Sequence, residues 1–222
     1  MTRTLVLALS GCDRLITDAL LAAATAHGAR TVQLNLSDEP VARGLRLSVL
    51  APPVDAFVTL TGEDLDATGL TAALGEACEV VRGWWADTEE PLPPREVTDG
   101  ERLDALANVA VLRRPADQSA EEWVRFWKEH HTAVAIETQG TFGYVQHRVV
   151  EALPGSPEVV AVVEEHFPMA ALSDLHAAYG SGGDDAELGR RLERLMASVS
   201  RLGADRDLDL VPTSRYRWTV GS

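Results

Sequence analysis

The sequence predicts an α+β protein built from two units in series, each with the element order β, α, β, β, α, β. The chain has 222 residues, of which 45% are hydrophobic and 24% charged, enough for two folded domains of about 100 residues. In both halves, short apolar runs alternate with segments of helical periodicity. An acidic, proline-rich stretch at 87–107 separates the halves. We therefore predict modules at 1–86 and 108–222, joined by a linker at 87–107.

The first half opens with an apolar run at 4–9 that predicts a buried strand. A helix follows from about residue 12 to residue 27, with an apolar stripe at near-helical spacing, and Gly28 ends it. Alternating apolar and polar residues at 31–37 predict a half-exposed strand. The stripe of that first helix consists of Leu15, Ala19, Ala22, Ala23 and Ala26.

The rest of the first half is less regular. Residues 45–51 and 56–62, separated by a Pro-Pro-Val-Asp segment, are interpreted as a strand, a break and a strand. A weaker helix from residue 64 is interrupted by Gly69 and Gly75 and leads into an apolar strand at 80–85.

The second half repeats the order. We predict strands at 108–114, 142–153, 158–167 and 214–220 and helical segments at 119–138, 170–179 and 184–202. Ser119 and Glu122 have the spacing of a capping box at the start of the first of these helices. The apolar stripe of the last helix consists of Leu188, Leu192, Leu195, Met196 and Val199.

Two such units are two ferredoxin-like modules, each an antiparallel sheet with helices on one face. A lone module exposes its other sheet face. Two modules can pair through their sheets and cover these faces, which predicts a barrel-like pair within one chain. The repeat is inferred from topology, because the halves share their order of elements more than their residues.

The net charge and the two cysteines limit which partners and which cellular compartment we expect. The formal charge of −14 disfavours binding to nucleic acid and to anionic membranes, so we expect neither partner. The N-terminal apolar run is too short for a signal segment or a membrane span, and we expect a cytoplasmic protein. Cys12 and Cys78 lie in no ligand-spaced pattern and are interpreted as small buried hydrophobes in a reducing compartment.

One set of motifs in the second half resembles a known family. The set is Arg113-Arg114-Pro115, Ser119-x-x-Glu122, Trp127 with His131, and Tyr144-x-Gln146. Over residues 108–220 it is similar to the EthD-like branch of the dimeric α/β-barrel superfamily. The first half lacks the Trp-x-x-x-His helix, so it resembles a degenerate partner module that replaces the second subunit of the family's usual homodimer. A further homodimer of the whole chain remains an alternative.

The resemblance implies a pocket for a small hydrophobic or aromatic ligand. The family includes cyclases, dehydratases, isomerases and monooxygenases that act on aromatic or polyketide-like compounds without a bound organic cofactor, so no cofactor is expected. It also includes members without a known role, so the resemblance does not choose a reaction.

The helix at 119–138 carries the first candidate residues. Its predicted inward stripe comprises Trp123, Phe126, Trp127, His130, His131 and Val134. Helical spacing alone leaves open which of the two histidines faces inward, and the resemblance favours His131.

The strand after this helix supplies the second histidine. Period 2 places His147 on one face with Val145 and Val149, and Tyr144 on the other with Gln146 and Arg148. Because the helix must cover the apolar face, we predict that His147 faces it and that Tyr144 points between the modules. His131 and His147 would then exchange protons with a substrate, while Tyr144 or an arginine polarises its carbonyl group. Alternatively, each histidine is a core residue bonded to backbone or to a carboxylate.

Other side chains are candidates for contact with the substrate. The full set is Trp123, Trp127, His130, Arg148, His166 and His176. His166 follows Glu164 and Glu165, but the spacing matches no metal-ligand set, so no metal is expected. The predicted function is a lyase, cyclase or isomerase acting on an aromatic or polyketide-like carbonyl compound. The alternatives are a non-catalytic protein that binds hydrophobic ligands and a protein that binds haem through one histidine.

Overall fold

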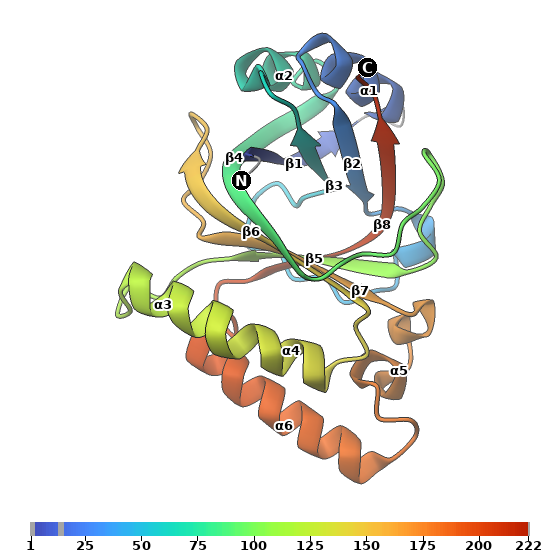
Figure 1. Cartoon of the computed structure of the whole chain (residues 1–222), viewed down its shortest axis with the longest axis vertical. Helices are drawn as coiled ribbons and strands as arrows, with labels where there is room; N and C mark the ends of the chain where they lie inside the picture. Colours follow the sequence, from blue (N-terminus) through green and yellow to red (C-terminus); the bar gives the residue numbers. More distant parts are fainter. Residues whose placement is uncertain (1–2, 13–15, 222) are drawn as a thin grey trace.

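The structure is a computed structural model that describes residues 3–12 and 16–221. Its strands close into one barrel in the order β1-β3-β2-β8-β5-β7-β6-β4, and neighbouring strands are antiparallel (Figure 1). The first half contributes β1 (Arg3–Cys12), β2 (Thr31–Leu36), β3 (Ala56–Thr61) and β4 (Cys78–Leu92). The second contributes β5 (Leu106–Leu112), β6 (Gly143–Ala152), β7 (Ala161–Phe167) and β8 (Asp209–Thr219).

Each half has the strand order of a ferredoxin-like module, β4-β1-β3-β2 and β8-β5-β7-β6. The two sheets join edge to edge, because β2 pairs with β8 and β4 pairs with β6. Closure leaves no unpaired edge strand in the barrel. The predicted fold class, two tandem modules that form an intrachain dimeric α/β-barrel, is confirmed.

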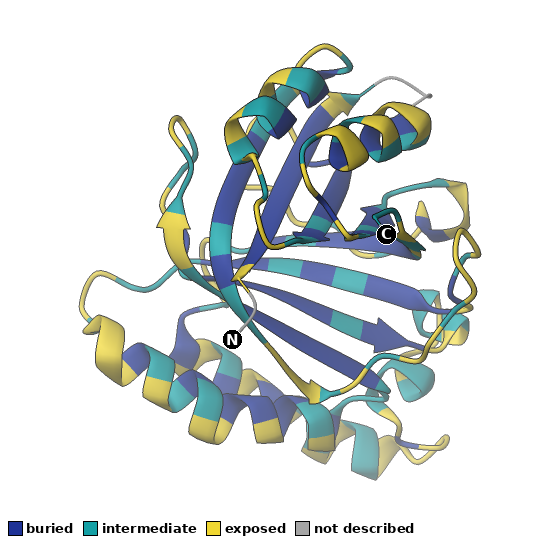
Figure 2. Ribbon diagram, turned by 45° about the horizontal axis from the view of Figure 1, so that its top comes forward, coloured by how far each residue is buried: buried dark blue, intermediate teal, exposed yellow. Residues whose placement is uncertain are grey.

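Helices cover the outside of both sheets (Figures 1 and 2). On the first module these are α1 (Ile16–Ala26) and α2 (Ala67–Leu74). On the second module a continuous helix consists of α3 (Ala120–Phe126), the π-helical segment η2 (Trp127–His131) and α4 (Thr132–Thr138), and α6 (Asp185–Leu202) packs beside it. The short elements are η1 (Glu39–Val41), η3 (Met169–Leu172) and α5 (Leu175–Tyr179).

The apolar core has three main layers. One lies between the first sheet and its helices, a second fills the barrel, and a third lies between the second sheet and its helices. Most strands are therefore buried on both faces, as the dark strands in Figure 2 show, whereas the later parts of β4 and β6 include exposed residues. Because both faces of such a strand are apolar, a period-2 pattern does not tell which face meets the helices.

Two predicted segments differ from the structure. Residues 45–51 form no strand, and their one ladder contact is a bridge between Leu47 and Leu210. The Asp209 carboxylate fixes the segment by accepting hydrogen bonds from the backbone of residues 49 and 50. The predicted linker at 87–107 begins inside β4, which continues to Leu92 because β6 supplies it with a hydrogen-bonding partner.

Three smaller predictions also need comment. Cys12 and Cys78, partners in the β1–β4 ladder, are joined by a disulfide, so the prediction of two free thiols is wrong. Met196, placed in the apolar stripe of α6, is 48% exposed, and Ser198 takes a buried position instead. The predicted apolar stripe of α1 is also wrong, because Ile16, Leu20 and Ala24 are the buried residues while Ala19, Ala22 and Ala26 are exposed; Leu15 lies outside the described residues. Within the described ranges, no helix is long and apolar enough to cross a membrane.

Candidate functional site

The helix expected to carry the site forms as predicted and then changes its pitch. Ser119 and Glu122 make the predicted capping box. From Trp127 to His131 the helix takes a π turn, and the Thr132 hydroxyl donates to the Trp127 carbonyl oxygen over 2.8 Å. Beyond this turn the spacing departs from 3.6 residues per turn, so the simple stripe does not hold.

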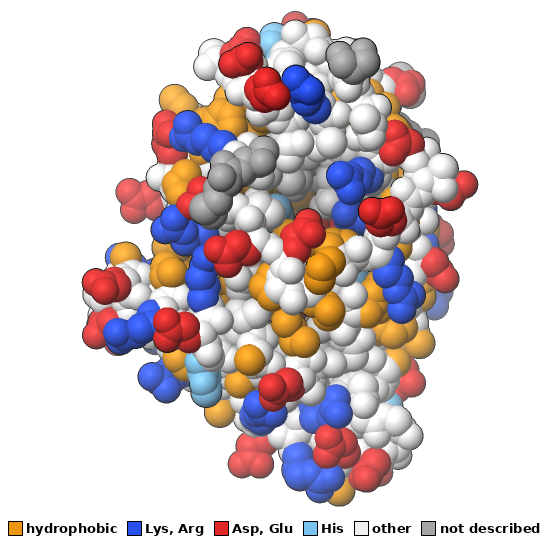
Figure 3. All heavy atoms as spheres, in the orientation of Figure 1, with side chains coloured by type: hydrophobic (Ala, Val, Ile, Leu, Met, Phe, Trp, Pro, Cys, Tyr) orange, Lys and Arg blue, Asp and Glu red, His pale blue; other side chains and the backbone are white. Residues whose placement is uncertain are grey.

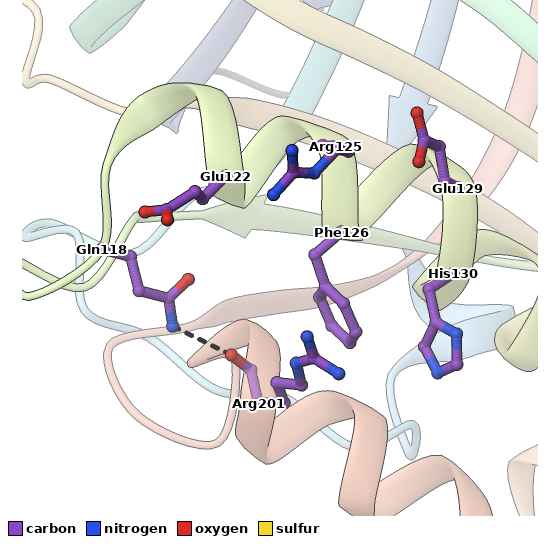
Figure 4. A pocket seen from close by; sticks show the side chains of 7 residues that line it. All are labelled: Gln118, Glu122, Arg125, Phe126, Glu129, His130 and Arg201. Carbon is purple, nitrogen blue, oxygen red and sulfur yellow. Dashed lines mark hydrogen bonds between the residues drawn. The ribbon is translucent and has the colours of Figure 1, made fainter.

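This geometry separates the two neighbouring histidines. His131 is buried between helices, with its Nδ1 2.9 Å from the Ser198 hydroxyl of α6, and burial lowers the pKa of His131 to about 4. His130 is exposed and packs on Phe126, with ring centroids 5.0 Å apart. It lines a charged surface pocket in which the Arg201 guanidinium lies over the Phe126 ring (Figure 4). His131 is therefore the inward histidine, but it faces α6 rather than a cavity.

The prediction for the faces of β6 is wrong. Tyr144 packs in the helix-side core beside Trp123 and Trp127, and Gln146 Nε2 donates to the Thr132 hydroxyl over 2.6 Å. His147 points into the barrel, where its Nδ1 lies 2.8 Å from the Thr88 hydroxyl. The prediction failed because the valines beside His147 fill the barrel, which needs apolar side chains as much as the helix layer does.

His131 and His147 thus lie on opposite sides of the second sheet and cannot act as one pair. Burial lowers the pKa of His147 to about 4, against the opposing effect of the Glu164 charge, so this imidazole is also neutral near pH 7. Both histidines have a hydroxyl partner. Their environments match the alternative interpretation of satisfied core histidines.

Inside the barrel, Glu164 of β7 is the centre of a polar network between the two halves of the chain. Its carboxylate lies 2.6 Å from His166 Nε2, accepts hydrogen bonds from Gln33 (2.6 Å) and Asn35 (2.9 Å), and lies 3.4 Å from Arg215 Nε. Burial alone would raise the pKa of Glu164, but the histidine, the arginine and the asparagine together hold it well below its usual range. His166 is therefore a partner in a buried network rather than a wall of an open pocket.

The next residue, Glu165, points to the helix side of the same sheet. In the strand register it stands opposite Tyr144 on one side and Asn108 on the other. Among the described residues its side-chain donor is Gln139, whose amide nitrogen donates to Ala135 O (3.0 Å) and to Glu165 Oε1 (2.9 Å) once the amide is turned so that nitrogen faces them. Enclosure by the surrounding protein raises the pKa of Glu165 to about 7, although the side chain keeps partial contact with solvent.

That contact runs through a cavity of about 360 Å³, a volume at the lower end of the usual range for ligand sites. Its walls come from β5, β7, η3, α5 and the segment after η1. The polar lining near Glu165 consists of Asn108, Gln139 and Tyr179, and burial, followed by the Glu165 charge, raises the pKa of Tyr179. The apolar lining includes Leu45, Leu106, Phe167, Leu172, Leu175 and Leu210.

A close helix contact positions Tyr179. Gly140, just after α4, donates its N–H to the Ala178 carbonyl over 2.7 Å. A Cβ at residue 140 would lie 2.2 Å from the Ala177 carbonyl oxygen, so only glycine permits this approach. The glycine that ends the long helix thus also holds α5, and with it Tyr179, against the pocket.

The remaining predicted residues do not reach this pocket. Arg148 pairs with Asp87 at the surface. His176 Nδ1 lies 2.7 Å from the Ser181 hydroxyl, and its Nε2 lies 3.3 Å from Asp185. Trp123 donates to the Leu202 carbonyl oxygen, and the Trp127 ring packs against it in a tilted arrangement with centroids 5.3 Å apart. Among the predicted residues, Tyr144 is the one in register with Glu165, although it does not line the cavity.

The lining residues Glu165, Asn108, Gln139 and Tyr179 are not among the site residues predicted from the sequence. A usable signal existed in the strand sequence Val-Val-Glu-Glu-His-Phe. Two consecutive glutamates in a strand must point to opposite faces. When both faces are buried, each carboxyl group needs either a network of donors or a functional reason to be there.

The haem alternative can be compared with the same geometry. No histidine among the described residues lines the Glu165 pocket. The inward histidines either bond to a hydroxyl group or lie inside the barrel against Glu164. The residues present therefore do not fit axial ligation of haem in this pocket.

Comparisons with known proteins bear on the fold. No protein-family model matches, and no curated protein matches. The chain is similar to the crystal structure of an anthrone oxidase-like protein, with a TM-score of 0.62, 10% identity, and coverage of 100% of this chain and 94% of that one. It is also similar to a proposed monooxygenase from Fusobacterium nucleatum, with a TM-score of 0.50, 7% identity, and coverage of 97% and 94%.

At such low identity these likenesses establish the fold over the whole chain and leave the chemistry open. The chain therefore has a dimeric α/β-barrel fold closed within one chain, with a pocket on the helix side of its second sheet.

Proposed function

We propose that this protein is an enzyme that moves a proton at a carbon atom next to a carbonyl group of a small apolar compound, with Glu165 as the base. The observation that carries the proposal is a carboxyl group with a pKa of about 7 on the wall of a mainly apolar cavity. A base with such a pKa is half ionised at neutral pH, where it can both take and return a proton. Perturbed groups of this kind concentrate at functional sites.

The chemistry needs three parts, and the pocket lining supplies residues suited to each. Glu165 takes the proton, so that the C–H bond breaks, a carboxyl O–H bond forms, and the electron pair moves onto the carbonyl oxygen. The side chains of Tyr179 and Asn108 can donate hydrogen bonds to the developing enolate, and the raised pKa of Tyr179 keeps its proton in place. The apolar walls exclude water and hold the carbon skeleton.

The fate of the enolate decides the reaction class. Return of the proton to another carbon gives an isomerase, loss of a neighbouring hydroxyl group as water gives a dehydratase, and attack on a second carbonyl group gives a cyclase. These outcomes match the lyase, cyclase or isomerase predicted from the sequence. Membership of the EthD-like branch is part of the same proposal, supported by the motifs in residues 108–220.

Oxygenation is the second candidate. The names of the two similar structures, an anthrone oxidase-like protein and a proposed monooxygenase, favour it. An enolate that meets dioxygen instead of a proton can be oxygenated, and Glu165 would serve the same first step. Consumption of oxygen in the presence of a ketone separates this outcome from isomerisation.

The test measures exchange of hydrogen for deuterium in 2-tetralone, a bicyclic ketone with acidic hydrogens next to its carbonyl group. We expect wild-type protein in D₂O to accelerate exchange at that carbon, as followed by NMR, with a rate that rises as pH increases through about 7. Glu165→Gln should reduce the catalysed rate by about 10²- to 10⁴-fold.

Glu193→Gln, at an exposed position on α6, is the matched control and should retain the wild-type rate. Equal catalysed rates in wild type and Glu165→Gln would reject Glu165 as the base. Tight binding of the ketone without exchange would favour the alternative of a non-catalytic binding protein.

A further inference from the structure

The mouth of the Glu165 pocket carries exposed apolar side chains. Six large hydrophobic residues are exposed among those the structure describes, and four of them are Leu45 (68%), Leu47 (41%), Val49 (48%) and Leu175 (59%). Leu45 and Leu175 also line the pocket. Leu47 and Val49 continue from Leu45 at alternate positions. We call these four residues the apolar lip.

The segment that carries most of the lip is held firmly in place. Leu47 exchanges two backbone hydrogen bonds with Leu210, of 2.9 and 3.0 Å. Asp209 Oδ1 accepts from the N–H groups of Val49 (2.8 Å) and Leu50 (2.9 Å), and Arg46 donates to the Val54 carbonyl oxygen over 2.7 Å. These leucines are thus presented to solvent by an anchored backbone.

A glycine brings this segment against the second module. A Cβ at Gly44 would lie 2.5 Å from Pro212 Cβ and 3.2 Å from Leu172 Cδ2, so a side chain there would force the segment away. Leu45 follows directly and reaches the cavity. The connection between β2 and β3, which belongs to the first module, therefore forms one wall of the site of the second.

The cavity itself is small. A volume of about 360 Å³ accommodates a one- or two-ring ketone but not a longer molecule. Apolar area that stays exposed next to a pocket indicates where more of a ligand is covered. The face drawn in Figure 3 has mixed charges, and the net charge of the chain is −14, so the apolar lip favours a neutral extension over a charged one.

From these observations we propose that the lip binds the apolar tail of a ligand whose carbonyl end lies at Glu165. The substrate class is then a ketone with an extended hydrocarbon part, longer than the cavity. Leu45 and Leu175 determine specificity for the length of that part. This inference rests on the proposed function, because the same pocket holds the carbonyl group.

The test measures binding of alkyl phenyl ketones from acetophenone to octanophenone by calorimetry. Once the cavity is filled, each added CH₂ should tighten wild-type binding about two- to fourfold, as expected for burial of a methylene against apolar surface. In Leu45→Ser/Leu175→Ser the gain per CH₂ should fall close to none. The gain is measured relative to acetophenone in each protein, because both side chains also line the cavity and the variant weakens binding of acetophenone itself. Met196→Ser, at an exposed position on α6, should behave as wild type.

An equal gain per CH₂ in wild type and the double variant would overturn the inference, and so would absence of any binding. A lip that instead joins two copies of the chain would show as a dimer that dissociates in the double variant, with the chain-length gain unchanged. The proposed function fails separately, when ketones bind with the chain-length gain but Glu165→Gln exchanges protons as fast as wild type.

Discussion

Glu164 and Glu165 are neighbours on β7, yet the two faces of the sheet give their carboxyl groups opposite properties. Inside the barrel, Glu164 has partners from Gln33, Asn35, His166 and Arg215, and its pKa is held below the usual range. On the helix side, Glu165 has Gln139 as its side-chain donor, and its pKa is raised to about 7.

Burial raises the pKa of both groups, so burial does not explain the difference. The difference in pKa comes from the number and charge of the hydrogen-bond donors around each carboxyl group. A carboxylate surrounded by donors is a structural ion that ties strands together, whereas one with few donors keeps a proton available near neutral pH. The two faces of the second sheet thus hold one carboxyl group that is ionised at neutral pH and one with a pKa of about 7.

The largest expected effect on stability is that of Glu164→Gln. The amide cannot accept from all the donors around it, and Arg215 is left as a buried charge without its counter-ion. We expect a loss of about 3–5 kcal/mol in the free energy of unfolding at pH 8, measured by urea denaturation. Because the folded pKa of Glu164 is lowered, its contribution to stability is present above the unfolded pKa of 4.5 and is lost as pH falls from there through the folded pKa.

The difference between wild type and Glu164→Gln should therefore shrink in acid. Glu193→Gln serves again as the surface control and should change the free energy by less than about 0.5 kcal/mol. A Glu164→Gln protein as stable as wild type at pH 8 would show that the barrel network contributes little.

Glu165→Gln should change the free energy of unfolding in the opposite direction, so that the variant is more stable than wild type at pH 8. The folded pKa of about 7 lies above the unfolded value of 4.5, so the contribution of Glu165 is fully present below pH 4.5 and is lost as pH rises through 7. At pH 8 the wild type holds an ionised carboxylate in an enclosed site, and the amide removes this cost. We expect Glu165→Gln to be more stable than wild type by about 1–3 kcal/mol at pH 8, allowing for partial solvent access.

Below pH 4.5 both proteins carry a neutral group at residue 165, and the gain should vanish. Denaturant curves at pH 4 and pH 8 measure this directly. A variant that loses activity and gains stability is the behaviour of a residue kept for function. Destabilisation by Glu165→Gln at pH 8 would instead identify Glu165 as a second structural carboxylate.

The fold was predictable because the order of strands and helices follows from local sequence patterns within each module. Apolar runs of strand length, a capping box at Ser119 and glycines at helix ends define the order of elements. The segment at 45–51 was predicted as a strand because its apolar residues alternate. In the structure it pairs only through the bridge at Leu47, and Leu45 lines the pocket. The extent of β4 depended on pairing with β6, which no local pattern contains.

The site was less predictable because its residues come together only through the tertiary fold. The phase of β6 could not be assigned from Val145 and Val149, since the barrel interior and the helix layer are both apolar. The sequence-based prediction chose histidines because an imidazole ordinarily titrates near pH 7. The pocket residue with a pKa near 7 is instead Glu165. Its pKa depends on how few hydrogen-bond donors reach it, and the donor it has, Gln139, is distant in sequence.

The two modules illustrate the same point with one topology. The helix-side face of the first sheet is packed with leucines and alanines of one continuous core. The equivalent face of the second sheet carries Tyr144, Gln146 and Glu165 among its apolar residues. The first module instead contributes the wall that carries Leu45, so its sequence could diverge from the motif-bearing half while it still shapes the site.

The smallest expected effect concerns the single donor to Glu165. Gln139→Met keeps the length of the side chain but removes the hydrogen bond that lowers the pKa of Glu165. One such bond is worth about 1 kcal/mol, so the pKa should rise by about 0.7 units, and the midpoint of the pH–exchange profile should move up with it. Gln118→Met, in the pocket around Phe126, is the control and should leave the midpoint in place. A midpoint that stays near 7 in Gln139→Met would mean that enclosure alone sets the pKa of Glu165, and the contrast with Glu164 would then rest on the barrel network rather than on a graded number of donors.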